Sequence, residues 1–200
     1  MIRVLARAGG RAEIMIHEPI GENWYGDGLT SKRFDADLKA LGDVTEIQVR
    51  INSPGGAVWD GLAIFNALKE HPAKVDVVVE GIAASIASVI AMSGDTIRMG
   101  EGAMMMIHNP WTVAIGDADD MRGVAEMLDK VGESLLDVYE KRSGLARAEI
   151  RTMLDAETWL TATEAVEKGF ADEAAAAETE QDEAAAALHA EHRERFARLA

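Results

Sequence analysis

The sequence predicts an α/β domain in which strands alternate with helices along the chain. Three observations support this class: short β-branched segments such as 75–79 (VDVVV), amphipathic segments between them, and turn residues at the junctions. The length of 200 residues suits one domain with a sizeable core, and the hydrophobic content of 48% is near the globular average. Such alternation implies crossover connections between strands of one sheet.

The expected elements follow one another in a regular order. A strand is predicted at 13–18, followed by a turn-rich loop and a helix that begins at Thr30. The later elements are strand 46–51, helix 59–68, strand 75–79, helix 81–94, strands 96–99 and 104–107, a long amphipathic helix 117–142, and helices 145–154 and 161–169. Thr161 and Glu164 make a capping-box pattern at the start of the last helix.

The C-terminal segment differs in composition from the rest of the chain. We expect one domain over residues 1–172 and a tail over 173–200 that is built largely of Ala and Glu. This composition favours a helical or disordered tail, because it lacks an apolar face wide enough to join the core. No catalytic role is predicted for it.

Composition and charge exclude several classes of function. The net charge of -15 argues against a nucleic-acid partner or an anionic membrane surface, because phosphates need a basic face. The chain has no cysteine, so disulfides, thiolate metal sites and a cysteine nucleophile are excluded. The charge-free stretch 81–94 is shorter than the roughly 18 residues that a bilayer requires, and the N-terminus lacks the apolar core of a secretory signal. A cytoplasmic protein is expected.

One serine stands in the middle of the charge-free stretch. Ser85 follows strand 75–79 closely and lies at the first turn of the predicted helix, where a nucleophile gains from helix N–H groups and the helix dipole. The alternative is a structural serine whose hydroxyl binds a backbone carbonyl one turn back. The pattern is not the G-x-S-x-G elbow, since Ala83 and Ala87 replace the glycines.

The segment INSPGG (51–56) ends a strand and leads into a helix. Its two glycines permit positive φ and close approach of another backbone, so its N–H groups can face an oxyanion. An ordinary strand-to-helix turn would have the same appearance. A phosphate-binding P-loop is excluded, because the Gly-to-Gly-Lys pattern is absent.

A serine nucleophile needs a base and an orienting acid. His108 directly follows strand 104–107, and strand ends in open α/β sheets are where sites are built. Asp155 and Glu157 precede the last helix and are the candidate acids. A structural histidine and two solvated loop acids remain the alternative reading.

Four segments together resemble the ClpP peptidase family of serine proteases. They are INSPGG (51–56), GIAASIAS (81–88), MMIHNP (105–110) and ETWLTATEAVEKGFAD (157–172), in the family's order and approximate spacing. The chain is similar in particular to the ClpP-related head maturation proteases of tailed phages and prophages. The resemblance implies the ClpP/crotonase fold, a superhelix of β-β-α units with a projecting helical handle.

The resemblance also implies a role for each matching residue. Ser85 would be the nucleophile and His108 the general base. The third member falls at Glu157, where the family usually has an aspartate, and Asp155 is the alternative acid. A glutamate can orient an imidazole, as other hydrolase triads show.

Backbone groups complete the implied site. The N–H groups of Gly56 and Ile86 would form the oxyanion hole. Ala57 and Val58 would offer a strand edge that pairs with an extended peptide substrate. Neither a metal nor an organic cofactor is implied.

The implied function is endopeptidase hydrolysis through an acyl-enzyme, in the cytoplasm or in a phage procapsid. Helix 117–142 resembles the family's handle, so a homo-oligomeric ring is expected, a heptamer or two rings stacked as a tetradecamer. The family has a longer segment before its first strand, with a loop that engages an ATPase ring, so the need for an ATPase partner stays open. Two alternatives share the fold: a crotonase-type acyl-CoA enzyme without a serine nucleophile, and a non-enzymatic ring or shell protein.

Overall fold

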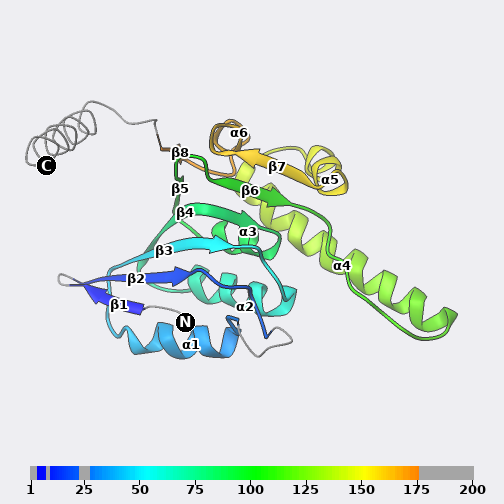
Figure 1. Cartoon of the computed structure of the whole chain (residues 1–200), viewed down its shortest axis with the longest axis horizontal. Helices are drawn as coiled ribbons and strands as arrows, with labels where there is room; N and C mark the ends of the chain where they lie inside the picture. Colours follow the sequence, from blue (N-terminus) through cyan, green and yellow to red (C-terminus); the bar gives the residue numbers. More distant parts are fainter. Residues whose placement is uncertain (1–3, 8–9, 23–27, 176–200) are drawn as a thin grey trace, which may run out of the picture.

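The computed structural model describes residues 4–7, 10–22 and 28–175 and confirms the α/β class (Figure 1). Its elements in chain order are β1 (Val4–Arg7), β2 (Arg11–Ile16), α1 (Ser31–Ala40), β3 (Glu46–Ser53), α2 (Val58–Lys69), β4 (Lys74–Ala84), α3 (Ile86–Ala91), β5 (Thr96–Met99), β6 (Met104–Ile107), α4 (Ala118–Ser143), α5 (Arg147–Asp155), β7 (Thr158–Thr161), α6 (Ala162–Glu167) and β8 (Glu173–Ala174). The tail from residue 176 lies outside the described residues.

The sheet is mostly parallel, with antiparallel pairs at two of its edges. Its strands follow the order β1-β2-β3-β4-β5-β8, and β6 pairs with both β4 and β7. β4 is the longest of the described strands. It pairs with β3 on one side and, on the other side, with β5 along its first half and with β6 along its end. These three partners make β4 the centre of the fold.

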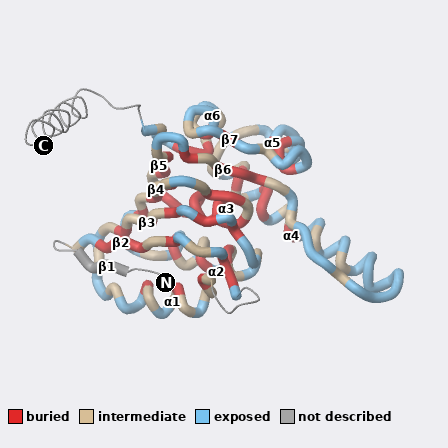
Figure 2. Tube along the Cα trace, viewed as in Figure 1, coloured by how far each residue is buried: buried red, intermediate tan, exposed pale blue. Residues whose placement is uncertain are grey.

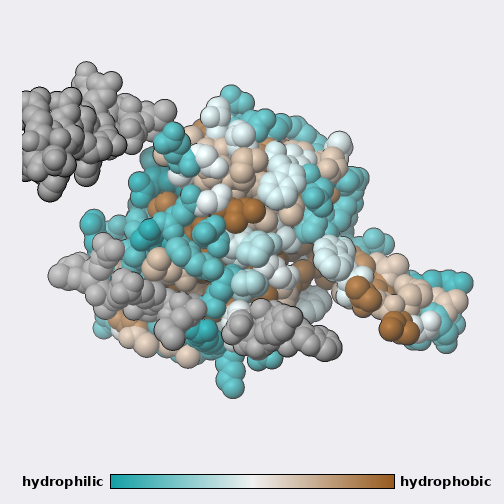
Figure 3. All heavy atoms as spheres, in the orientation of Figure 1, coloured by the Kyte–Doolittle hydropathy of each residue, from teal (hydrophilic) through white to brown (hydrophobic). Residues whose placement is uncertain are grey.

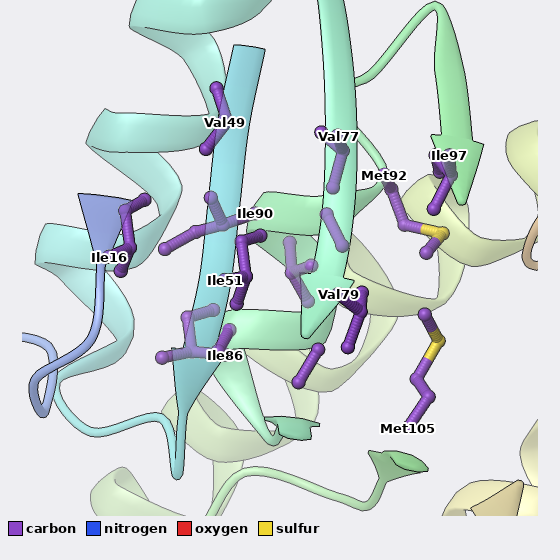
Figure 4. Packing of buried hydrophobic residues seen from close by; sticks show 14 of the residues in the cluster. Ile16, Val49, Ile51, Val77, Val79, Ile86, Ile90, Met92, Ile97 and Met105 are labelled. Carbon is purple, nitrogen blue, oxygen red and sulfur yellow. The ribbon is translucent and has the colours of Figure 1, made fainter. Parts of the chain in front are cut away.

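The core lies between one face of the sheet and the helices that cover it. Burial alternates along β3, as expected for a strand with one face against a core. Side chains of β3 and β4 meet those of α3 in this layer, among them Ile51, Val79 and Ile90 (Figure 4). Figure 2 shows the buried segments concentrated in these strands and in α3. α3 is buried along its whole length, which places its N-terminus firmly at the end of β4.

Local capping signals account for where several helices begin. Thr30 caps α1 by accepting a hydrogen bond from the N–H of Arg33. Asp117 caps α4 through a capping box with Asp120, and Thr161 caps α6 through the predicted capping box with Glu164. The carboxylate of Glu164 accepts from the Thr161 N–H and hydroxyl, which lowers its pKa.

The prediction of a helix over 81–94 was wrong in its first half. Residues 81–84 continue β4, because β3 pairs with Ala83 and β6 pairs with residues 82–84. Only Ile86–Ala91 are helical. Hydrogen bonds from strands distant in sequence override the helical preference of this alanine-rich stretch.

Three further strands were not predicted. β1 pairs with β2, and β7 pairs with β6, each in antiparallel fashion. β8 (Glu173–Ala174) pairs with β5, so these two residues of the segment predicted as a tail lie on the sheet. All three are short, and sequence periodicity over two to four residues carries little signal.

The first half of α4 projects from the body as an arm, together with the extended segment that leads to it (Figures 1 and 2). We define the arm as residues 111–130. Large apolar side chains are exposed on it, namely Trp111, Val113, Ile115, Met121 and Met127. Figure 3 shows apolar side chains gathered on the arm. Within the described ranges no helix is long and apolar enough to cross a membrane.

Candidate active site

The topology of the sheet brings the predicted site residues to one edge. β3, β4 and β6 run parallel to one another, so their carboxyl ends lie on the same side. The turn at Gly55 and Gly56 follows β3, Ser85 follows β4, and His108 follows β6. Residues distant in sequence therefore meet because each comes directly after a parallel strand.

Ser85 occupies an unusual backbone conformation. It is the N-cap of α3 with φ 56° and ψ -130°, a region that costs a residue other than glycine about 1–3 kcal/mol. Its N–H donates to the carbonyl of Met106 at 2.9 Å, and its carbonyl accepts from the N–H of Ser88 at 3.0 Å. Contacts on both sides thus hold the serine at the sharp turn from β4 into α3.

The hydroxyl of Ser85 is in contact with an imidazole. His108 Nε2 lies 2.7 Å from Ser85 Oγ, a hydrogen-bonding distance for an O–H group and a ring nitrogen. The His108 side chain is only 16% exposed. This is the geometry that a general base needs to take the proton of a serine.

The far side of the same imidazole faces Glu157. Glu157 Oε2 lies 3.8 Å from His108 Nδ1, within ion-pair range although longer than a hydrogen bond, and its side chain is 59% exposed. The register explains the contact: Ile107 pairs with Thr158, so the residue after β6 lies beside the residue before β7. Glu157 has φ 48°, because the chain turns sharply from α5 into β7 at this point.

Asp155 does not face the imidazole. Its Oδ1 accepts a hydrogen bond from Asn109 Nδ2 at 2.7 Å. Of the two acids left open by the sequence, Glu157 is the one that the structure brings to His108. The role of Asn109 was not predicted, and its place next to His108 was the only signal that could have suggested it.

The turn after β3 is held by a serine and by a distant backbone segment. The hydroxyl of Ser53 donates to the carbonyl of Glu18 at 2.7 Å and accepts from the N–H of Gly55 at 3.2 Å. The N–H of Ile20 donates to the carbonyl of Gly55 at 2.9 Å. Ser53 was not singled out from the sequence, although a serine directly before a Pro-Gly turn is a known turn-forming pattern.

The fold itself does not use the two N–H groups predicted for an oxyanion hole. In residues 10–22 and 28–175 neither the Gly56 N–H nor the Ile86 N–H is paired with an acceptor. A side-chain carbon added at Gly55 would lie 3.2 Å from the Ile86 nitrogen and 2.7 Å from Ser85 Cβ. The absence of a side chain at Gly55, whose φ is 91°, therefore keeps open the space beside Ser85 and the Ile86 N–H.

The prediction that Ala57 and Val58 form a strand edge needs correction. The Ala57 N–H donates to the carbonyl of Ile20 at 2.8 Å, and its carbonyl accepts from the N–H of Gly61 at 3.1 Å. Val58 is the first residue of α2. Both residues are committed to the helix start, so neither offers a free edge for main-chain pairing with a peptide.

A cavity of about 480 Å³ opens above the Ser85 and His108 pair. Its lining comprises Pro54, Gly55, Gly56, Val58, Ser85, Met106, His108, Pro110, Trp111, Thr112 and Val113. Val58 thus lines the cavity, and residues 110–113 form another part of its wall. The cavity is large enough to receive side chains of a peptide bound in extended form.

The chemistry that these residues offer is acyl transfer. No group of three or more His, Asp or Glu side chains in the described part of the chain is placed to hold a metal ion. A hydroxyl next to an imidazole, with unpaired N–H groups beside it, can attack a carbonyl and stabilise the resulting oxyanion.

Comparison with known proteins shows which family the chain belongs to. A family model described as Clp protease matches residues 30–178. The chain is similar to an ATP-dependent Clp protease proteolytic subunit of Bacteroides fragilis, with 32% identity over 152 residues, 74% of this chain and 73% of the relative. It is also similar to a protein of the same name from Streptococcus pneumoniae, with 32% identity over 164 residues, 80% of this chain and 82% of the relative. The chain therefore belongs to the Clp protease family and is a serine-type endopeptidase of the ClpP kind.

Proposed function

We propose that the chain hydrolyses peptide bonds through an acyl-enzyme formed on Ser85. The observation that carries this proposal is the 2.7 Å contact between Ser85 Oγ and His108 Nε2 at the base of the cavity. Neither residue is exposed on an open surface, and the backbone of Ser85 is held in a strained conformation that points to function rather than to packing.

In the first half-reaction Ser85 Oγ attacks the carbonyl carbon of the scissile bond while His108 Nε2 takes its proton. The Gly56 and Ile86 N–H groups stabilise the oxyanion of the tetrahedral intermediate. The carbon–nitrogen bond then breaks as the imidazolium gives its proton to the leaving amine. In the second half-reaction water attacks the ester carbonyl while His108 Nε2 takes a proton from the water. The bond between Ser85 Oγ and the acyl carbon then breaks as the imidazolium returns that proton to Ser85 Oγ, and the acid product leaves.

Glu157 supports the imidazole in this scheme. Its carboxylate lies on the Nδ1 side at 3.8 Å, so it favours the tautomer with the proton on Nδ1 and stabilises the imidazolium that forms. A half-exposed acid at this distance gives weaker support than a buried, hydrogen-bonded one, because solvent screens the charge. The contact would shorten if substrate or a second subunit excluded water from the site.

The test is active-site labelling. Wild type, Ser85→Ala and Ser93→Ala would be incubated with a fluorophosphonate probe, and the labelled peptide identified by mass spectrometry. Ser93 is a buried serine near the end of α3 whose hydroxyl donates to the carbonyl of Ile90, which makes it a matched control. We expect labelling at Ser85 in wild type and Ser93→Ala and none in Ser85→Ala. Absence of label in a folded wild type would contradict the proposal.

Self-association through the arm is the second part of the proposal. Ile115 is 98% exposed and Val113 is 82% exposed, and they belong to the group of exposed apolar side chains on the arm. A gathering of exposed apolar side chains marks an interaction surface. A homo-oligomeric ring, heptameric or stacked as two rings, would cover them. Ile115→Asp should therefore lower the mass measured by sedimentation velocity, whereas Lys141→Asp, at an exposed position of α4 outside the arm, should not. An unchanged mass in Ile115→Asp would remove this role from the arm.

A finer assignment, to the head maturation proteases of phages, rests on resemblance in the segments 49–75, 104–111 and 157–162. Under this assignment the substrate would be a capsid or scaffold precursor. The two relatives described above are named as subunits of an ATP-dependent protease. Turnover of an unfolded protein without ATP or any partner would favour the phage-type assignment. Turnover confined to short peptides would instead indicate a need for an unfoldase.

A further inference from the structure

A buried chain of hydrogen bonds reaches the nucleophile from the C-terminal half of α4. Tyr139 Oη lies 2.8 Å from Ser88 Oγ, and Ser88 Oγ lies 2.6 Å from the carbonyl oxygen of Ser85. Tyr139 and Ser88 are both buried, and the hydrolytic steps above use neither of them. These hydrogen bonds link α4, which does not line the cavity, to the backbone of Ser85.

The direction of these hydrogen bonds follows from the donors available. A carbonyl oxygen can only accept, so the single proton of the Ser88 hydroxyl must be donated to Ser85. The Tyr139 hydroxyl must then donate to Ser88 Oγ. Two hydroxyl groups pointing the same way polarise each other, which strengthens the final bond to the carbonyl.

Fixing the Ser85 carbonyl also fixes the N–H group of the next residue. The peptide unit between Ser85 and Ile86 is planar and trans, so its carbonyl and its N–H point in opposite directions along one rigid plane. The Ser88 N–H already donates to this carbonyl at 3.0 Å, and the hydroxyl adds a second donor. Any rotation of the plane would therefore stretch two hydrogen bonds and would turn the Ile86 N–H away from the oxyanion.

Tyr139 is itself held in place. Its ring packs edge-to-face on Phe170 with centroids 5.8 Å apart. Burial raises the pKa of its hydroxyl well above the ordinary value, so the group remains a neutral donor over the working range of pH. In the described part of the chain its hydroxyl has Ser88 as its hydrogen-bond partner.

We infer that Tyr139 and Ser88 are positioning residues that orient the peptide between Ser85 and Ile86 and thereby aim the Ile86 N–H at the oxyanion. This inference rests on the proposed function, because it concerns the same oxyanion hole. It also gives α4, whose first half forms the exposed arm, a direct connection to the catalytic backbone. Neither residue touches the reacting atoms.

The test compares Tyr139→Phe, Ser88→Ala and the double variant with wild type. Tyr139→Phe keeps the ring on Phe170 and removes only the donor. Hydrolysis of a fluorogenic peptide would be measured as kcat and KM, with active sites titrated by fluorophosphonate so that unfolded protein does not count. We expect kcat to fall severalfold in Tyr139→Phe and about tenfold in Ser88→Ala, less than the loss of a whole oxyanion donor. KM should stay within about twofold, and the double variant should match Ser88→Ala.

Leu135→Ala is the control for general loosening of the core. Leu135 is buried on α4, one turn from Tyr139, and has no part in the chain of hydrogen bonds. It should lower the melting temperature while kcat per titrated site stays at the wild-type value. Two results would overturn this inference and leave the proposed function standing. One is a wild-type kcat in Tyr139→Phe, and the other is a loss of kcat in Leu135→Ala as large as that in Ser88→Ala. A wild type that neither labels nor turns over would overturn the proposed function and the inference with it.

Discussion

Asn109 Nδ2 donates a hydrogen bond to Asp155 Oδ1 across 2.7 Å, and this contact ties the residue after His108 to the end of α5. Glu157 lies two residues further on, where the chain turns into β7. The bond therefore joins the segment that carries the base to the segment that carries the acid. It also accounts for the different contacts of two acids that are only two residues apart in the sequence.

This relationship predicts different effects for the two acids. Glu157→Gln should lower kcat by about ten- to a hundredfold, because the amide no longer stabilises the imidazolium; a fully buried triad acid would cost more. Asp155→Asn should lower kcat only a few-fold, since it disturbs the loop and leaves Glu157 in place. Steady-state kinetics on a peptide substrate would measure both. Equal losses in the two variants would reverse the assignment of the acid.

Gly55 is predicted to be indispensable for a steric reason. A side-chain carbon there would lie 2.6 Å from the carbonyl oxygen of Ala84 and 2.7 Å from Ser85 Cβ. Gly55→Ala should therefore destabilise the fold by about 1–3 kcal/mol through overpacking, beyond the cost of a positive φ, and should abolish labelling of Ser85.

Gly102→Ala is the matched control for this substitution. Gly102 also has a positive φ, of 70°, but nothing lies within 4 Å of an added carbon. It should carry only the backbone cost of about 1 kcal/mol and should label normally. Urea unfolding and probe labelling of both variants would separate the two contributions. If Gly102→Ala lost labelling as well, close packing against Ser85 would not be the cause.

The same substitution should have opposite effects in two helices. At Gly61 in α2 an added carbon would lie 2.1 Å from Ile86 Cγ1, so Gly61→Ala should cost about 1–3 kcal/mol. At Gly123 in α4 nothing lies within 4 Å, and Gly123→Ala should stabilise by up to about 1 kcal/mol through helix propensity. Denaturant unfolding would give both free energies. If both substitutions changed the free energy of unfolding in the same direction, contact with Ile86 would not be what decides the effect at Gly61.

The junction between α4 and α5 should be sensitive to acid. Glu133 accepts hydrogen bonds from Arg147 at 2.6 Å and from Arg151 at 2.5 Å, which lowers its pKa below the ordinary 4.5. Because the folded-state pKa is depressed, the stabilisation is present above the unfolded-state pKa and is lost as pH falls through the folded-state value.

The melting temperature measured against pH would test this. Glu133→Gln should lie below wild type at neutral pH, and the two curves should converge as pH falls through the lowered folded-state pKa of Glu133. Glu126→Gln is the control, since Glu126 is an exposed acid on the same helix without an ion pair among the described residues. A gap between Glu133→Gln and wild type that persisted at low pH would assign the effect to packing rather than to charge.

Much of the fold and part of the site could be read from the sequence. The predicted strands at 96–99 and 104–107 have the bounds of β5 and β6, and the long helix differs from α4 by one residue at each end. These segments carry their own signals: a short alternating or continuously apolar run bounded by turn residues, or a cap followed by an amphipathic repeat. Ser85, His108 and the two glycines could be proposed because each follows a recognisable strand.

Tertiary structure decided the features that depend on distant partners. Residues 81–84 became strand because β3 and β6 supply their hydrogen bonds, and Glu157 rather than Asp155 faces His108 because Ile107 pairs with Thr158. The connection from Tyr139 through Ser88 to Ser85 spans 54 residues of sequence between its ends and leaves no local pattern. Local propensity acts over a few residues, whereas strand register and buried hydrogen bonds form only when the whole sheet and its helices pack together.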